Sequence, residues 1–263
     1  MIRALYTAAS GMNAQQANMD NIAHNLANVN TTGFKKSRLE FEDLVYQQVK
    51  APGSQASAST EAPTGLSVGL GTRAVATARD FSAGNMRSTN GPLDMAIQGD
   101  GFFQISLPNG TTGYTRNGSF QKDAQGLLVT SDGYPVEPQI TIPANATSVS
   151  VSKDGIVSVQ IPGQSATQVV GTLTLSTFSN PAGLLALGGN LFAATSASGD
   201  PQTGAPGTDA RGSIAQGFVE DSNVSVVEEM VKMIVAQRAY EVNSKAVQSA
   251  DEMMQMSNNL RRS

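Results

Sequence analysis

The sequence predicts an α+β fold in which N- and C-terminal helices form a coiled-coil-like α domain and the middle of the chain forms an antiparallel β domain. Three observations support this. Apolar residues recur every seven positions near each terminus, short β-rich runs alternate with Asn-Gly and Asp-Gly pairs in the middle, and a stretch poor in apolar residues separates the two patterns. With 263 residues, the chain can form one large domain or two modest ones.

The first predicted helix covers residues 2–29. Ile2, Ala9, Gln16 and Ala23 share one heptad position, and Leu5, Met12, Met19 and Leu26 share the position three further on. A helix of this length measures about 42 Å, so we expect its apolar seam to need a partner. Turn-forming residues from Asn28 to Gly33 end it. We predict that this helix makes its self-assembly contacts through Leu5, Met12, Met19, Ile22 and Leu26.

The second predicted helix runs from about Val226 to Leu260. Its stripe comprises Val226, Met233, Tyr240, Val247 and Met254, with Met230, Ala236 and Ala250 beside it. We assign self-assembly to Val226, Met230, Met233, Tyr240, Val247 and Met254. Two interpretations are equally supported by the residues alone: the helices await partner helices, or they form a hairpin packed on the chain's own domain.

The pattern in the middle of the chain predicts β-hairpins. β-rich runs at 102–107, 148–152 and 171–178 are separated by Asn109-Gly110, Asn117-Gly118, Asp132-Gly133 and Asp154-Gly155. Gly99 and Gly101 are expected to allow close backbone approach, and one ring of Phe102 and Phe103 is expected in the core.

Two segments are predicted to be flexible connectors. Residues 50–65 are rich in Ser, Ala, Pro and Gly, including Pro52, Gly53, Pro63 and Gly65, and are too poor in apolar residues to build a core. Residues 197–212 have a similar composition and are expected to lead the chain out of the β domain. We therefore predict a helical assembly domain from residues 1–40 and 217–263, an extended connecting region at 41–91, and a central β domain at 92–210.

Composition argues against several classes of function. Seventeen basic residues against 21 acidic ones leave no basic excess for nucleic acid. No apolar run is long enough to insert in a membrane, and no cleavable signal peptide is recognisable. The chain has no cysteine and one histidine, His24, so we predict no enzyme, no cofactor and no metal site. Most aspartates lie beside glycines in turns, where they accept backbone hydrogen bonds.

Motifs at both ends of the chain resemble one family. Asn25-Leu26-Ala27-Asn28 with Gly33-Phe34-Lys35 is similar to the signature of the bacterial flagellar rod, hook and hook-associated axial proteins, and Glu229 to Val247 resembles their closing helix. In this comparison the motif residues are Asn25, Leu26, Asn28, Gly33 and Phe34. The segment from Phe41 to Gln47 resembles the distal rod branch of the family, and residues 46–65 resemble its insert. The resemblance implies that the insert links adjacent subunits through Pro52, Gly53, Pro63 and Gly65.

The resemblance implies a structural role in motility. Copies would polymerise helically into a straight, hollow distal rod that crosses the periplasm and transmits torque from motor to hook. The implied partners are further copies, the proximal rod and hook proteins, the rod cap with its muramidase, the P- and L-ring bushing and the type III export apparatus, which exports the chain without a cleaved signal.

Two alternatives remain. One is a proximal rod or hook subunit. The other, from a different class, is a secreted adhesin or carbohydrate-binding module whose terminal helices oligomerise it. A pair of carboxylates clustered in a cleft of the β domain would favour an enzyme.

Overall fold

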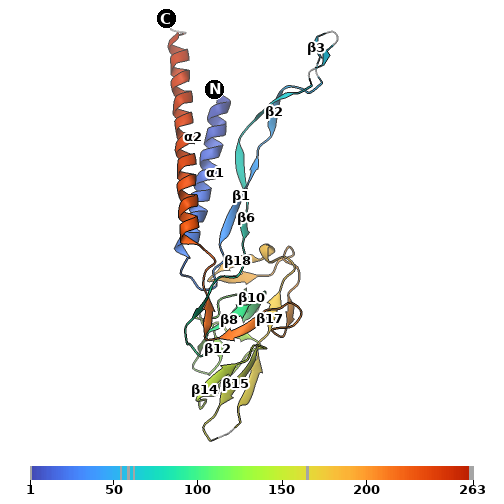
Figure 1. Ribbon diagram of the computed structural model, residues 1–263, viewed down its shortest axis with the longest axis vertical. Helices are drawn as coiled ribbons and strands as arrows, with labels where there is room; N and C mark the ends of the chain where they lie inside the picture. The colour runs from blue at the N-terminus through green and yellow to red at the C-terminus, as the bar shows by residue number, and fades with distance from the viewer. Residues whose placement is uncertain (1, 54, 58–59, 62, 164–165, 261–263) are drawn as a thin grey trace. The chain divides into compact units, whose positions relative to one another are not determined.

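The computed structural model describes residues 2–53, 55–57, 60–61, 63–163 and 166–260, and it confirms the α+β class (Figure 1). Helix α1 (Ile2–Ala27) begins the chain and α2 (Val226–Leu260) ends it, with strands between them. The chain forms two compact units. Unit 1 comprises the described parts of 1–27, 37–78 and 225–263, and unit 2 comprises those of 28–36 and 79–224.

Both helices match their predicted positions closely. Helix α1 ends two residues earlier than expected, where the amide of Thr31 donates to the carbonyl of Asn28 in a turn. Helix α2 has the predicted bounds, with Glu228 and Glu229 in its first turn, where negative charge favours the helix dipole. Neither helix, over its described residues, has an apolar stretch long enough to cross a membrane.

Most of the predicted connecting region forms a long β-hairpin, as Figure 1 shows, whereas its last part, residues 80–91, belongs to unit 2. Three successive antiparallel pairs make up this hairpin, which we call the arm: β1 (Ser37–Asp43) with β6 (Thr72–Arg79), β2 (Tyr46–Lys50) with β5 (Leu66–Gly69), and β3 (Gln55–Ser57) with β4 (Thr60–Glu61). The composition of 50–65 suggested an unpaired segment. The strands pair because backbone hydrogen bonds require no core, although a two-stranded ribbon is marginal on its own.

Unit 2 is built on one large antiparallel sheet. Its strands follow the order β18 (Leu185–Gly188), β19 (Leu191–Ala193), β10 (Thr112–Thr115), β9 (Phe102–Ser106), β17 (Leu175–Thr177) and β20 (Gln202–Gly204), and β13 (Val136–Glu137) also pairs with β9. Gly110, Gly133 and Gly155 have positive φ in the turns between strands, as the Asn-Gly and Asp-Gly pairs predict.

Shorter strands complete unit 2. The remaining elements are β7 (Met86–Ser88), β8 (Met95–Gln98), β11 (Gln121–Lys122), β12 (Leu128–Val129), β14 (Ser148–Val151), β15 (Ile156–Gln160), β16 (Gln168–Thr172), the 3-10 helix η1 (Pro181–Gly183), β21 (Ser213–Gln216) and β22 (Phe218–Glu220). Strand β8 pairs with β21, β7 with β22, β11 with β12, and β14, β15 and β16 form a three-stranded sheet.

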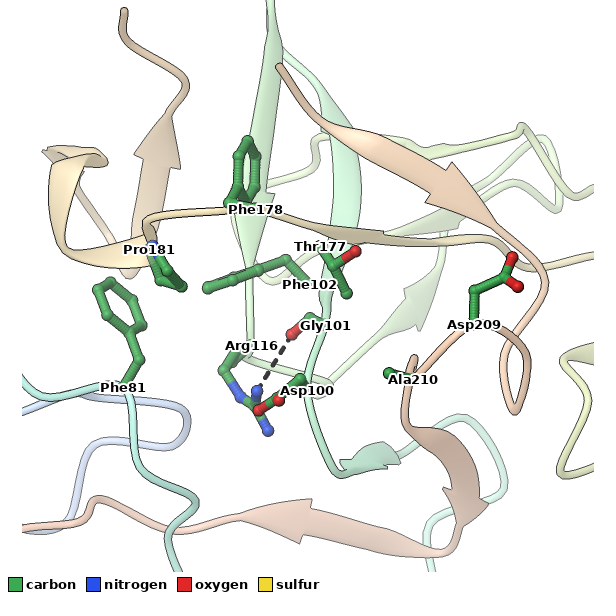
Figure 2. Close-up of a pocket in the computed structure, with 10 residues that line it drawn as sticks. All are labelled: Phe81, Asp100, Gly101, Phe102, Arg116, Thr177, Phe178, Pro181, Asp209 and Ala210. Atoms are coloured by element: carbon green, nitrogen blue, oxygen red, sulfur yellow. Dashed lines mark hydrogen bonds between the residues drawn. The ribbon is translucent and has the colours of Figure 1, made fainter. Parts of the chain in front are cut away.

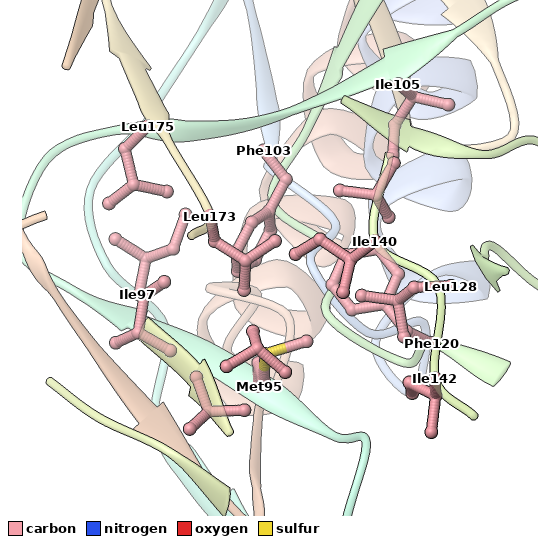
Figure 3. Close-up of a cluster of buried hydrophobic side chains, with 14 of the residues drawn as sticks. Met95, Ile97, Phe103, Ile105, Phe120, Leu128, Ile140, Ile142, Leu173 and Leu175 are labelled. Atoms are coloured by element: carbon pink, nitrogen blue, oxygen red, sulfur yellow. The ribbon is translucent and has the colours of Figure 1, made fainter. Parts of the chain in front are cut away.

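The core of unit 2 lies on both sides of β9. Phe103 belongs to a large aliphatic cluster with Met95, Ile105, Leu128, Ile140, Leu173 and Leu175, shown in Figure 3. Phe102 belongs to an aromatic cluster with Tyr114, Phe178, Leu184 and Phe192. The expectation that one of the two rings is buried is wrong, because successive residues point to opposite faces of β9 and both faces are covered.

Two further predictions about the middle of the chain are wrong. Residues 197–212 do not leave the sheet, because β20 within them pairs with β17. Gly118 does not form a hairpin turn. It lies against the backbone of Met95, where an added Cβ would be 1.5 Å from the carbonyl oxygen, so glycine is required there by close packing.

Candidate assembly surface

The two terminal helices pack against each other in unit 1 (Figure 1). The Asn25 side chain of α1 donates to the Glu229 carboxylate of α2 over 3.3 Å, and Gly11 of α1 lies so close to Asn243 of α2 that an added Cβ would be 2.9 Å from its amide nitrogen. Asn25, late in α1, contacts Glu229, early in α2, and Gly11, earlier in α1, contacts Asn243, later in α2, so the pair is antiparallel. The chain therefore covers one face of each helix itself.

The predicted seam of α1 lies at the side of this contact rather than at its centre. Ile22 is buried, whereas Leu5, Met12, Met19 and Leu26 are half-buried. The fully buried positions are Ala8, Ala14, Ile22 and Asn25. The heptad assignment followed the apolar side chains, whereas small residues and an asparagine occupy the closest approach within the chain; the assignment of the seam to self-assembly stays a prediction.

The seam residues of α2 divide into two groups. Met233, Val247 and Met254 are half-buried, on the side of α2 that contains the buried Ala236 and Ala250. Val226, Met230 and Tyr240 are exposed. The intrachain helix pair thus accounts for part of the predicted stripe and leaves other apolar side chains uncovered.

A second apolar face runs along the first half of α2, and we call it the outer face. It consists of Val227, Val231, Ile234 and Val242, which are 73%, 56%, 56% and 65% exposed. At about 100° per residue, Val227, Val231 and Ile234 lie on the side of the helix opposite Ala236. Val242 lies at the edge of that side, and the charged Arg238 separates it from Ile234. Single exposed apolar side chains are ordinary, but a row of them along a helix indicates an interaction surface.

The N-terminal motif begins with a buried polar junction in unit 1. Asn25 is 2% exposed, accepts from the amide of Ser37 over 2.9 Å and donates to its carbonyl over 2.8 Å. Its contact with Glu229 adds α2 to the junction, and Glu229 is held from the other side by Lys232 over 2.6 Å. Asn25 thereby fixes α1, α2 and the base of the arm to one another, while Leu26 and Asn28 are half-buried beside it.

The rest of the motif is built into unit 2. Gly33 has φ of +69° and donates its amide to the carbonyl of Glu220 over 2.8 Å. An added Cβ at Gly33 would lie 2.6 Å from the amide nitrogen of Asn117, so both conformation and space require glycine. Phe34, the next residue, is buried.

A buried ion cluster that the sequence analysis missed follows the motif. Lys35, Glu220 and Arg116 have side chains no more than 2% exposed, and Glu220 accepts from Lys35 over 2.7 Å and from Arg116 over 2.8 Å. The guanidinium of Arg116 also donates to the carbonyls of Gly99 and Gly101, over 2.9 and 3.2 Å. A charged residue at the end of the apolar run Phe218-Val219 was the available signal for Glu220.

The charges of this cluster shift one another's pKa. Burial would raise the pKa of Glu220, but the positive charges of Arg116 and Lys35 and a hydrogen bond from the Gly84 amide hold it below its ordinary value. Burial, with repulsion from Arg116, lowers the pKa of Lys35 although Glu220 opposes that shift. The cluster joins three segments of unit 2 that are far apart in the sequence.

The arm exposes apolar side chains along its length. Val45, Tyr46, Val49, Leu66 and Val68 are between 38% and 78% exposed. Pro52 and Gly53 form the turn after β2, where Gly53 has φ of +77°, and Gly65 packs against Pro52, since an added Cβ would lie 2.8 Å from its ring. Pro63, like Pro52 and Gly65, is exposed. The arm is therefore a ribbon without a core of its own.

A pocket of about 280 Å³ in unit 2 tests the enzyme alternative (Figure 2). Phe81, Phe102 and Phe178 line it with Asp100 and Asp209. Asp209 is paired with Arg211 over 3.0 Å, and Arg116 is occupied by Glu220. Two carboxylates do share this pocket, but the described lining residues include no histidine or lysine beside them, and nowhere among the described residues do three His, Asp or Glu side chains group as metal ligands would.

Comparison with known proteins identifies the family. Residues 5–35 match the flagella basal body rod protein model, residues 96–159 match the flagellar hook protein FlgE/F/G D1 domain, and residues 215–260 match the flagellar basal body rod FlgEFG protein C-terminal model. The chain is 54% identical to the flagellar basal-body rod protein FlgG of Borreliella burgdorferi over 264 residues, covering all of both chains.

The chain belongs to the FlgG family of flagellar basal-body rod proteins. It is also 49% identical to FlgG of Caulobacter vibrioides, over 99% of this chain and all of the relative, and 41% identical to FlgG of Bacillus subtilis over the full length of both. The flagellar basal-body rod protein FlgF of Caulobacter vibrioides is less similar, at 37%. The chain is therefore a structural subunit of the flagellar rod, in agreement with the resemblance that its two terminal motifs indicate.

Proposed function

We propose that copies of this chain polymerise helically into the straight, hollow distal rod and transmit torque from motor to hook. The outer face of α2 is the observation on which this proposal rests. A FlgG-family chain that covers one side of α2 with its own α1 and leaves Val227, Val231 and Ile234 uncovered has a surface for another copy. Covering each such side chain fully contributes roughly 1.5–3 kcal/mol.

The terminal segments 1–40 and 217–263 serve as the assembly domain in this proposal. Their helices form a coiled-coil-like bundle with neighbouring copies, whose seam includes the exposed Val226, Met230 and Tyr240. The connecting region 41–91 contacts adjacent subunits through the arm, and the β domain at 92–210 forms the outer part of the rod. A head-to-tail contact whose rotation does not close a ring generates a helical tube when it is repeated.

The placement in the cell is also part of the proposal. The rod crosses the periplasm inside the P- and L-ring bushing, joins the proximal rod to the hook, and grows beneath a rod cap with muramidase activity. The type III export apparatus delivers each chain without removing a signal peptide, and a chain with no cysteine can pass through a narrow channel without disulfides to reduce.

The test replaces Ile234 by Glu in the bacterium's own copy of the gene. A carboxylate on the outer face would be desolvated in a contact between subunits, so we expect basal bodies whose rods lack their distal part in electron micrographs. Gln168→Glu is the matched control, because it adds the same charge to an exposed position on β16 in unit 2, which belongs neither to the outer face nor to the helix seam. Normal distal rods with Ile234→Glu would contradict the proposal, provided that both variants fold alike by circular dichroism.

Deleting residues 50–65 tests the arm separately. The deletion removes the end of the arm and leaves the helices and the sheet of unit 2 intact, so we expect a folded monomer whose rods have altered straightness or length. Straight rods of normal length from the deleted chain would show that the arm has no bracing role.

A further inference from the structure

Strand β18 is an edge of the main sheet of unit 2, and its pairing with β19 is interrupted by a β-bulge between Ala186 and Gly188. The sheet ends at β18, which pairs with β19 on one side, and the described part of the chain supplies no strand on the other. All four residues of β18 are exposed, with Leu185 57% and Leu187 48% exposed. The outer backbone amides and carbonyls of such a strand are available to pair with an added strand.

Soluble proteins usually block exposed edges with charge, proline or a β-bulge; β18 has a bulge between Ala186 and Gly188 but neither a charge nor a proline. No Asp, Glu, Lys or Arg occurs between Gly155 and Gly199, although the carboxylate of Asp132 lies beside Gly189, just after the strand. A free, apolar and uncharged edge is a liability unless it has a partner. In an exported structural subunit, that partner is expected to be part of the assembly.

The arm, in turn, lacks a third strand beside its two-stranded ribbon. Strands β2 and β5 form a ribbon with no third strand among the described residues, and such ribbons are marginal in water. Strand β5 contains no charge, and its Leu66 and Val68 share one face because they are two residues apart. Strand β2, in contrast, ends in the charged Lys50.

We propose that β5 of one copy adds to β18 of a second copy as a further strand of its sheet. Backbone hydrogen bonds supply the pairing, and Leu66 and Val68 lie beside Leu185 and Leu187 as apolar neighbours across strands. The inference rests on the proposed polymer and names the surface that receives the arm.

The proposed contact between β5 and β18 is head-to-tail. Because β5 and β18 are different surfaces, each copy gives one strand and receives another, so the contact repeats along the polymer without closing. Pairing of β18 with β18 would be symmetric and would end at two copies. The two arrangements therefore predict different cross-linked products.

The test uses introduced cysteines, because the chain has none. Basal bodies carrying Val68→Cys with Leu187→Cys in the full chain are treated with a short bifunctional maleimide, which tolerates small shifts in strand register. We expect a ladder of covalent multimers on a denaturing gel. Val68→Cys with Val169→Cys is the matched control, because Val169, 59% exposed against 48% for Leu187, lies on the separate sheet of β16, and this pair should give no ladder.

Several results would overturn the proposal. Normal rods without a ladder, a ladder of equal strength in the control pair, dimers from Leu187→Cys alone, or cross-linking confined to a single chain each exclude docking of β5 on a neighbour's β18. Failure of the unmodified chain to form rods would instead refute the proposed function.

A charge on the edge gives a second measurement that needs no cross-linking. Leu187→Lys places an ammonium where β5 would pack, so we expect at least a tenfold drop in rods per cell, whereas Val169→Lys leaves the number unchanged. Equal numbers of rods for the two lysine variants would also reject the proposal.

Discussion

Replacing Glu220 by Gln should destabilise unit 2 far more than any change at the neighbouring surface ion pair. The Glu220 carboxylate accepts three hydrogen bonds, from Lys35, Arg116 and the amide of Gly84, at 2.7 to 2.8 Å. A glutamine side chain has one oxygen to accept and an NH₂ group that faces the same donors, so two buried cations lose their counter-charge. Removing one partner of a buried ion pair costs about 3–5 kcal/mol.

The assay is thermal unfolding of the full chain by calorimetry. For a folding unit of this size, each kcal/mol lowers the melting temperature by about 2–4 °C, so we expect a drop of roughly 6–20 °C in the transition of unit 2. Asp221→Asn is the control, because Asp221 pairs with Arg87 at the surface over 3.0 Å and such pairs contribute about 0–1 kcal/mol. If the two variants melt within a degree of each other, the buried cluster does not stabilise unit 2.

Three further predictions follow from the same contacts. In the folded chain the pKa of Glu220 lies below its ordinary value of 4.5. Its stabilising contribution is therefore complete above pH 4.5 and is lost as the pH falls through the folded pKa. The acid unfolding midpoint of unit 2 should move less for Asp221→Asn than for Glu220→Gln. Gly33→Ala should cost roughly 1–3 kcal/mol in urea unfolding, against about 1 kcal/mol for Gly53→Ala, whose neighbourhood is empty. Asn25→Ala should lower the free energy of unfolding of unit 1 by about 1–3 kcal/mol, because buried partners are left unsatisfied, and Asn13→Ala, at an exposed position of the same helix, should not lower it.

The helices and hairpins were predictable because their signals are local. Heptad spacing located α1 and α2 to within two residues, and Asn-Gly or Asp-Gly pairs marked three of the turns. Gly118 shows the limit of such rules. The same dipeptide is used there for close packing on Met95, which lies far away in the sequence, and no local pattern distinguishes the two uses.

The parts that the sequence did not predict depend on distant contacts. Lys35, Arg116 and Glu220 come from three separate segments, and a lone charge in an apolar run does not reveal its partner. Pairing within the arm was missed because Ser, Pro and Gly indicate a poor core and say nothing about backbone hydrogen bonds. The centre of the intrachain helix contact was not predicted for a related reason: Gly11 and Asn25, which allow the closest approach and a buried hydrogen bond, are not apolar.

Those two residues also set the register of the helix pair. An antiparallel pair with a plain apolar seam can slide by one heptad, about 10 Å, and still bury similar side chains. Here a slide would separate Asn25 from Glu229, leaving both polar groups buried without each other, and would move Asn243 away from the gap that Gly11 provides. A single buried polar contact is the best-attested means of fixing register in helix pairs. Because Asn25 also binds Ser37, the position of the outer face of α2 along the helix axis is fixed relative to the base of the arm. A contact that repeats between copies requires this fixed position.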